Sequence, residues 1–529
     1  MSYVVEQKIN GRIYLYEVES FWDKEKKQPR QRRKYLGPKE KIYKKSASKL
    51  EALKPEPALQ AKPSNFVSKS YGDVFLLNYL QKELGITDLL KEEFGDIYKE
   101  MLTLSSFMLG NPSGSYLFPY WHEEHYLEGV KKLNSQNLSE LYEYVGRHEG
   151  ERLDFLKNWG QHLNPTSGIY YDITSVSSYS TNIEAVEWGY NRDKEYLPQI
   201  NIGFTHCSKT SLPLSYNVHP GSIVDVSTLK NVIKTFNLFE LKNLFFILDR
   251  GFCSVSNIIE MYQNNMKFIQ PLSFSLNKAK ELVSKHKVDI CRSENAFCYK
   301  EEVLYHKRDK IEFEEIKLDT HIFYNEKAAV DYKHYIYKIL LEIEKEIKKA
   351  SSFESDKDCK NYLENNVNCR YQKYFKIENK VIIKNLGAIE DAIFRAGTFI
   401  LVVHGEDLNN EQIIEAYRNR DRVEKDINSI KNQIDTKRLR AHNQDTAQGR
   451  LFIKFLSLIV TTKIMNVIKG DKKLKKYSIN EIMAELKKIK INSFDGKNKF
   501  ITELSKKQKL IFKAFKIDTD KIIDSVHGY

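Results

Sequence analysis

Cysteine is scarce in this chain, with 6 among 529 residues, and no two of them form a Cys-x-x-Cys pair. Zinc knuckles and disulfide frameworks both need closely and regularly spaced cysteines, so this scarcity speaks against both kinds of site. It fits a protein kept in a reducing cytoplasm. The scattered positions are Cys207, Cys253, Cys291, Cys298, Cys359 and Cys369.

Long uninterrupted apolar runs are also lacking. The most apolar stretch, from Leu451 to Ile468, is broken by Lys454 and Lys463, so we expect a buried helix too short to span a bilayer. The N-terminus has no basic segment followed by an apolar one, so no secretory signal is expected. These features predict a cytoplasmic protein with no membrane partner.

Charge is abundant, and its distribution is uneven. The chain carries 84 Lys and Arg against 71 Asp and Glu, a formal net charge of +13. Residues 1–50 account for +8 (14 minus 6) and residues 471–529 for +7 (15 minus 8), which leaves −2 for the middle. Basic ends around a near-neutral body suit a protein whose termini bind a polyanion while its centre does chemistry. Solvated lysine-rich helices and loops explain the same charge equally well.

The pattern of residues divides the chain into segments. Residues 3–20 alternate around Asn10-Gly11, which predicts a two-residue β-hairpin, and a basic run follows it. A helical pattern covers about 73–163, and the texture changes to short apolar strands near Gly168. We expect a basic hairpin arm and linker at 1–66, a helical DNA-binding region at 67–163, an α/β core in two parts at 164–275 and 396–470, an insertion domain at 276–395, and a basic helical C-terminal region for dimerisation or DNA contact at 471–529.

Two aspartates follow apolar strands of the expected core. Three strands, a helix-length gap, a strand, a helix and a strand predict an α/β arrangement, with Asp172 ending the first strand and Asp249 the fourth. Ligands usually bind where strands end at the edge of such a sheet. Taken separately, Asp172 could be a helix cap and Asp249 part of a turn.

The segment from Tyr417 to Lys431 favours a functional role for the two aspartates over a purely structural one. Tyr417, Arg420, Glu424 and Lys431 are offset by 0, 3, 7 and 14 residues. At about 100° per residue they fall at roughly 0°, 300°, 340° and 320°, so they share one polar stripe of a helix. Such a stripe holds one carboxylate among groups that bind phosphate.

Asp172, Asp249 and Glu424 together could converge on two divalent cations. Metals about 3.5–4 Å apart can activate an attacking oxygen and stabilise a leaving oxygen in phosphoryl transfer. Carboxylate oxygens suit Mg²⁺, so we expect two Mg²⁺ ions, with Mn²⁺ as a substitute and no small-molecule cofactor. Arg420 and Lys431 would then contact phosphate.

These residues resemble the DDE transposases of bacterial insertion sequences, in the branch that carries a Tyr-x2-Arg-x3-Glu-x6-Lys helix. Tyr417, Arg420, Glu424 and Lys431 match that motif at every spacing, and the sequence separation of 175 positions from Asp249 to Glu424 leaves room for the insertion typical of the branch. The resemblance implies a ribonuclease H-like core with Asp172, Asp249 and Glu424 as catalytic metal ligands. It also implies that Tyr417 and Lys431 contact the transposon end.

Other DNA contacts are expected from basic residues near these segments. Arg438 and Arg440 follow the motif helix, and the run that contains Arg30, Arg32 and Arg33 is a candidate arm that contacts phosphates, although a solvated hairpin loop explains it as well. The resemblance implies a flipped base at the cut, for which the insertion offers aromatic platforms such as Phe297 or Tyr299.

The sequence thus predicts a cut-and-paste transposase that binds the terminal inverted repeats of its own insertion sequence, cleaves them, and joins the 3′-hydroxyl ends to target DNA. Its partners would be double-stranded DNA, at the ends and at the target, and a second copy of the chain, in a nucleoid-associated homodimer. Two alternatives stay open: a non-catalytic DNA-binding regulator, and a structure-specific nuclease on the same fold.

Overall fold

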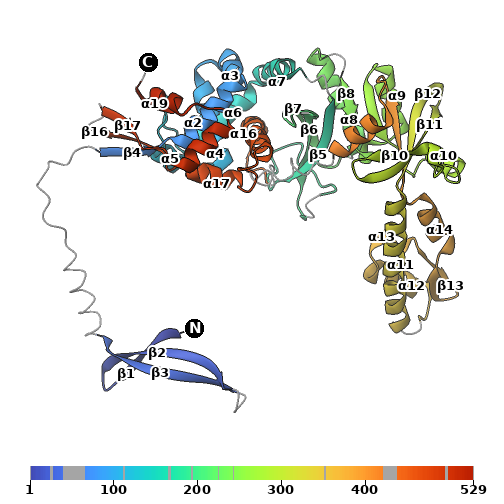
Figure 1. The fold of residues 1–529 in the computed structure, drawn as a ribbon, viewed down its shortest axis with the longest axis horizontal. Helices are drawn as coiled ribbons and strands as arrows, with labels where there is room; N and C mark the ends of the chain where they lie inside the picture. The colour runs from blue at the N-terminus through green and yellow to red at the C-terminus, as the bar shows by residue number, and fades with distance from the viewer. Residues whose placement is uncertain are drawn as a thin grey trace, which may run out of the picture. The chain divides into compact units, whose positions relative to one another are not determined.

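The computed structural model describes residues 2–23, 28–39, 66–110, 114–164, 168–191, 195–223, 225–241, 244–350, 353–420, 438–494 and 498–527. It divides into two compact units. The smaller consists of Met1–Val67 with Ser493–Asn498, and the larger of Ser68–Asn492 with Lys499–Tyr529. Each unit is described by itself (Figure 1).

The smaller unit is built on an antiparallel sheet of order β1-β2-β3. A turn at Asn10 (φ 47°) and Gly11 (φ 80°) joins the first two strands, which explains the Asn-Gly pair, because this turn needs two left-handed residues. The basic run is not only a hairpin loop, because much of it lies in the third strand. The strands are β1 (Ser2–Ile9), β2 (Arg12–Asp23) and β3 (Gln28–Pro38).

A helical region opens the larger unit. Its first helices are α2 (Gly72–Glu83), α3 (Ile86–Phe94), α4 (Tyr98–Gly110), α5 (Phe118–Glu124), α6 (Ser135–Arg147) and α7 (Glu149–Leu163). α2, α4 and α6 pack against α16 (Gln444–Gly470), which comes from far later in the chain, and α3 and α7 contact its Phe452 through Phe94 and Phe155. This helix has 27 residues, so it is longer than the apolar run predicts and long enough to cross a membrane by length and composition. Since 72% of its most apolar window is buried, α16 is a core helix.

Close approach between α6 and α16 depends on two glycines. A Cβ atom on Gly146 would lie 1.8 Å from the backbone oxygen of Asp445, and one on Gly449 would lie 1.9 Å from that of Tyr142. The two helix backbones therefore touch where each has no side chain.

The rest of the larger unit is organised by a nine-stranded mixed sheet, which confirms the α/β class. Its order is β10-β11-β12-β15-β9-β8-β5-β6-β7. β5 is parallel to β8, and β8 is parallel to β9, whereas β6 is antiparallel to both of its neighbours, β5 and β7. The strands that follow the predicted succession are β5 (Ile169–Ser177), β6 (Gln199–Cys207), β7 (Pro213–Pro220), β8 (Phe245–Ile247) and β9 (Lys267–Pro271).

Helices cover both faces of this sheet. On one face, α8 (Asp225–Leu238), α9 (Val255–Gln263) and α10 (Asn277–His286) bury apolar residues in a core that is continuous with the helical region. On the other face, a helix that includes residues 410–420 packs Ile413 and Ile414 against a second core. The motif helix is thus present as far as residue 420, and the rest of it lies outside the described residues.

The predicted insertion contributes to two structures. β10 (Ala296–Tyr299), β11 (Glu302–Phe313) and β12 (Ile316–Tyr324) extend the main sheet, which continues through β15 (Thr398–His404). The second structure is a small helical subdomain with a core of its own. It contains α11 (Glu326–Lys349), α12 (Asp356–Asn366), α13 (Cys369–Gln372), β13 (Phe375–Glu378), β14 (Val381–Lys384) and α14 (Leu386–Arg395).

The C-terminal region is not purely helical, contrary to the prediction from its sequence. It holds α17 (Ile479–Leu486), α18 (Lys506–Ala514) and α19 (Thr519–His527). It also holds β16 (Lys490–Phe494) and β17 (Asn498–Ile501), which form a three-stranded sheet with β4 (Phe66–Ser70).

Candidate active site

Asp172 lies in β5, and Asp249 lies two residues beyond the end of β8, the parallel neighbour of β5. In the β5–β8 register Tyr170 pairs with Ile247, so two residues further along Asp172 stands level with Asp249. Asp249 keeps an extended backbone (φ −82°, ψ 160°), so the strand alternation carries over to it. Both carboxylates therefore project from the same face of the sheet, on strands about 4.8 Å apart.

That face is the one covered by the motif helix, because Tyr170 and Ile247 belong to the core that contains Ile413 and Ile414. Asp172 differs from the expectation in one respect. It lies in the interior of β5 rather than at its end, since the strand continues to Ser177 through full pairing with β6.

Asp249 already has a cationic neighbour. Its Oδ1 accepts a hydrogen bond from the backbone N–H of Arg250 at 2.6 Å and lies 3.3 Å from Nη2 of Arg420. The Arg420 side chain is only 10% exposed, whereas that of Asp249 is 45% exposed. The arginine thus reaches the carboxylate from the protein side and leaves its other side open to solvent.

The motif helix is held in place by contacts with the sheet. The hydroxyl of Tyr170 donates to the backbone oxygen of Ala416 at 3.2 Å, and the ring of Tyr417 stacks on Phe399 with centroids 6.3 Å apart. The guanidinium of Arg420 lies 5.8 Å from the centre of the Tyr417 ring. Arg420 therefore lies between the Tyr417 ring and Asp249 and is near both.

Glu424 and Lys431 lie outside the described residues, so the third carboxylate and the lysine are not placed. Over the described ranges, no group of three His, Cys, Asp or Glu side chains is arranged to hold a metal ion. Asp172 and Asp249 nonetheless fit a magnesium site chemically, because two level carboxylates offer the hard oxygen ligands that Mg²⁺ prefers. The complete predicted ligand set requires Glu424.

Arg438 and Arg440 lie near the far end of β5. Arg438 bridges to Ser177, its Nη1 donates to the hydroxyl of Tyr179 at 3.2 Å, and its Nη2 lies 3.5 Å from Glu195. The backbone oxygen of Arg440 accepts a hydrogen bond from Arg450 at 2.7 Å. The segment that holds both arginines therefore runs beside the end of β5, several residues away from Asp172.

Exposed aromatic side chains accompany Arg438, and sequence reasoning missed them. The segment after β5 exposes four large rings, although no regular spacing marks them in the sequence. They are Tyr179, Trp188, Tyr190 and Tyr196. The aromatic platforms expected in the insertion are less accessible, because Tyr299 is buried and Phe297 packs beside it under the motif helix.

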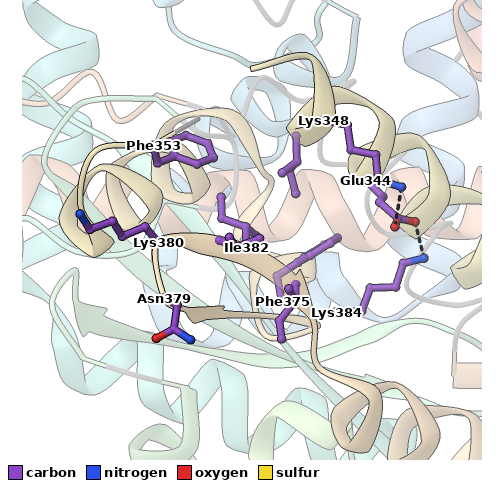
Figure 2. Close-up of a pocket in the computed structure, with 11 residues that line it drawn as sticks. Glu344, Lys348, Phe353, Phe375, Asn379, Lys380, Ile382 and Lys384 are labelled. Atoms are coloured by element: carbon purple, nitrogen blue, oxygen red, sulfur yellow. Dashed lines mark ion pairs between the residues drawn. The ribbon is translucent and has the colours of Figure 1, made fainter. Parts of the chain in front are cut away.

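A pocket of about 680 Å³ lies away from the carboxylates, in the helical subdomain that contains α11–α14 (Figure 2). Its floor is apolar, with Phe353, Phe375 and Ile382, and Glu344 at its edge pairs with Lys348 and Lys384. None of the predicted site residues lines it. The pocket is therefore separate from the chemistry proposed for this chain.

Comparisons with known proteins identify the family of this chain. The model of a family described as "Transposase DDE domain" matches residues 164–460. No curated protein matches the chain. Among solved structures, a piggyBac transposase in a synaptic complex with hairpin DNA is distantly similar, with a TM-score of 0.35 and 11% identity, over 79% of this chain and 76% of that one. Since the family model covers more than half of the sequence, including Asp172, Asp249 and the whole motif helix, the chain belongs to the transposase DDE domain family.

Proposed function

We propose that this protein is a cut-and-paste transposase of a bacterial insertion sequence. It binds the terminal inverted repeats of its own element, cleaves the ends, and joins the freed 3′-hydroxyl groups to target DNA. The observation that carries this proposal is the level placement of Asp172 and Asp249 on one face of parallel strands, beneath a helix that presents Tyr417 and Arg420.

The order of the central strands supports a ribonuclease H-like core. β7, β6 and β5 form an antiparallel meander, and β8 and β9 then add in parallel on the other side of β5. A carboxylate on the first strand and another after the fourth are what the expected catalytic core requires. Glu424, four residues beyond Arg420 in the sequence, would complete the set.

In this proposal the three carboxylates, Asp172, Asp249 and Glu424, hold two Mg²⁺ ions, which Mn²⁺ can replace. Such ions supply the charge that activates the attacking oxygen and stabilises the leaving oxygen. The protein's own residues bind and orient the DNA end around that site. Tyr417, Lys431, Arg438 and Arg440 contact the end, with the arginines and the lysine on its phosphates.

Arg420 has a double task in this scheme. Without DNA it neutralises Asp249, at a distance of 3.3 Å, and so relieves repulsion between two neighbouring carboxylates. When a phosphate arrives, the guanidinium can exchange the carboxylate for phosphate oxygens, which match its planar fork equally well. The exchange would free Asp249 at the moment when substrate is bound.

We further propose that the active form is a homodimer on two paired ends, because both ends must be cut and joined in one complex. It would act in the cytoplasm, on the DNA of the nucleoid.

The test is cleavage of labelled duplexes that carry the gene's own flanking ends, by the wild type and by Glu424→Gln, in Mg²⁺, Mn²⁺ and Ca²⁺. Nicking at the element boundary in Mg²⁺ or Mn²⁺, lost in the variant while DNA binding persists, is the expected result. Tight binding by the wild type without any cleavage would instead identify a DNA-binding regulator. Cleavage with no joining of the ends to a plasmid target would identify a nuclease.

A further inference from the structure

The sheet of the smaller unit has two chemically different faces. Side chains alternate between the two faces along each strand. Val18 of β2 pairs with Tyr3 of β1 and with Arg33 of β3, so these three side chains lie on one face. Glu19 pairs with Arg32, so these two side chains lie on the opposite face. The tyrosine face, as we name the first, is defined by Tyr3, Tyr14, Tyr16, Gln31, Arg33 and Tyr35. The glutamate face contains Glu17, Glu19, Phe21, Arg30, Arg32 and Lys34.

On the glutamate face, basic residues have acidic partners across the strands. Glu19 stands opposite Arg32, and Glu17 stands opposite Lys34. The guanidinium of Arg32 also lies 5.9 Å from the centre of the Phe21 ring. Opposite charges at facing positions cancel much of the field that would attract a phosphate backbone.

The tyrosine face has the opposite character. Over residues 3–21 and 30–38 it carries Arg12 and Arg33 and no carboxylate. Nη2 of Arg33 donates to Oε1 of Gln31 at 3.4 Å, and Nε2 of Gln31 donates to the hydroxyl of Tyr3 at 3.2 Å. Arg32 and Arg33, which are neighbours in β3, therefore lie in two different environments.

Aromatic rings give this face a broad surface for contact. The ring of Tyr35 lies 5.4 Å from that of Tyr16 and 6.0 Å from that of Tyr14. Tyr3 and Tyr35 are 49% and 53% exposed. Half-exposed tyrosines, which combine an apolar ring with a polar hydroxyl, are typical of surfaces that contact a partner with mixed apolar and polar groups.

Two neighbouring strands of the sheet, about 4.8 Å apart, have the dimensions of the two-stranded β-ribbon that the major groove of B-DNA, about 12 Å wide, admits. Base edges in that groove present acceptors and donors that Arg and Gln recognise in pairs, together with thymine methyl groups that apolar surfaces contact. Where the structure describes it, the tyrosine face carries no carboxylate, and residues 1–50 have a net charge of +8. Phosphates therefore do not repel this face.

We propose that the tyrosine face of β1–β3 enters the major groove of the element's terminal DNA and reads its sequence, with Arg33 and Gln31 on base edges. This inference rests on the proposed function. It divides the basic run, which the sequence treats as one arm that contacts phosphates: Arg33 specifies bases, whereas Arg32 adds only general attraction.

The experiment compares two adjacent arginines that differ in the face they occupy. The full-length protein is titrated, by fluorescence anisotropy, into a labelled duplex of the element's end and into a duplex of shuffled sequence and equal composition. Arg33→Gln and Arg32→Gln remove the same charge from neighbouring positions of β3. Arg33→Gln is expected to lower the preference for the end about tenfold or more, as loss of a bidentate base contact does. Arg32→Gln is expected to weaken binding to both duplexes by the same factor.

A second variant, Tyr35→Leu, should also reduce the preference, because it removes an exposed ring from the same face. Equal losses of preference in the two arginine variants, or a larger loss in Arg32→Gln, would overturn the inference. Tighter binding of single-stranded DNA than of the duplex end would overturn it as well. If the wild type itself shows no preference for the end, the proposed function fails, whereas end cleavage with an undiminished preference in Arg33→Gln contradicts only the role of this face.

Discussion

Arg420 is the residue at which the fold and the chemistry of the site meet. It is nearly buried, it lies over the ring of Tyr417, and it reaches Asp249 from the protein side. A group in this position stabilises the site when DNA is absent and can bind the DNA when it arrives. Its substitution should therefore affect both states.

We expect Arg420→Ala to slow end cleavage by on the order of 10–100-fold, because a hydrogen bond to a charged group is worth about 1.5–3 kcal/mol. Arg420→Lys should recover the charge but only part of the rate, since lysine lacks the planar fork. Single-turnover cleavage at saturating DNA measures the effect. Arg395→Ala serves as the control and should cleave at the wild-type rate. It removes an arginine that pairs with Asp391 in the helical subdomain.

A pair of histidines on the same face of the sheet makes a separate prediction about pH. Nε2 of His306 lies 2.9 Å from Nδ1 of His321. Burial, and after it the neighbouring charge of His321 for His306 and of Arg308 for both, lowers the pKa of each to about 4. The folded protein keeps both rings neutral, while the unfolded chain takes up protons near its ordinary pKa of about 6.5.

The stability that the neutral histidine pair contributes should therefore be fully present above pH 6.5 and be lost as the pH drops from 6.5 towards 4, because the unfolded state then binds more protons than the folded state. Thermal unfolding at pH 7 and pH 5 tests this expectation. The variant His306→Phe, whose ring can still pack on Phe323, should lose less stability over that interval than the wild type does. An equal loss in the two proteins would rule out the histidine pair as the cause.

At the scale of elements, the contact between α6 and α16 depends on missing side chains. Gly449→Ala would place a methyl group against the backbone oxygen of Tyr142, so we expect a loss of about 1–3 kcal/mol in the free energy of unfolding. Gly150→Ala is the matched control, because a Cβ atom there meets nothing within 4 Å. That variant should be unchanged or more stable by up to about 1 kcal/mol, since alanine is the better helix former. Denaturant unfolding of both variants provides the comparison.

Elements with plain apolar patterns were predictable, and elements with charged surfaces were not. β6 and β8 are buried along their whole length, so their apolar runs identify them in the sequence. β3 and β11 alternate many charged residues on exposed positions, so the sequence places one in a basic run and the other in a charge-rich insertion. The end of β5 was missed because Thr174, Ser175 and Ser177 are polar.

The candidate site shows the same division. The spacing of Tyr417 and Arg420 predicts that they share a helical face, because that relation is local. The level placement of Asp172 and Asp249 depends on the register between β5 and β8, which residues 77 positions apart in the chain determine together. No local pattern in either strand specifies that register.

At the scale of the whole molecule, the two basic ends predict strongly salt-dependent binding to DNA of any sequence. A protein that contacts six or more phosphates loses roughly a thousandfold or more in affinity between 50 and 200 mM salt. We expect a loss of this order for a duplex unrelated to the element. A much smaller loss would show that the lysines of residues 471–529 and the arm do not contact DNA backbone.

The burial of α16 among helices that precede it by some 300 residues also bears on synthesis. A ribosome adds about 5–20 residues per second, so α2–α7 wait roughly 15–60 s for the helix that fills their centre. During that time a nascent chain exposes the apolar surface of α2–α7 that α16 later buries. A chain that stops before residue 444 would keep this surface open and should be captured by chaperones or degraded, so truncated copies would be poor competitors for the element's ends.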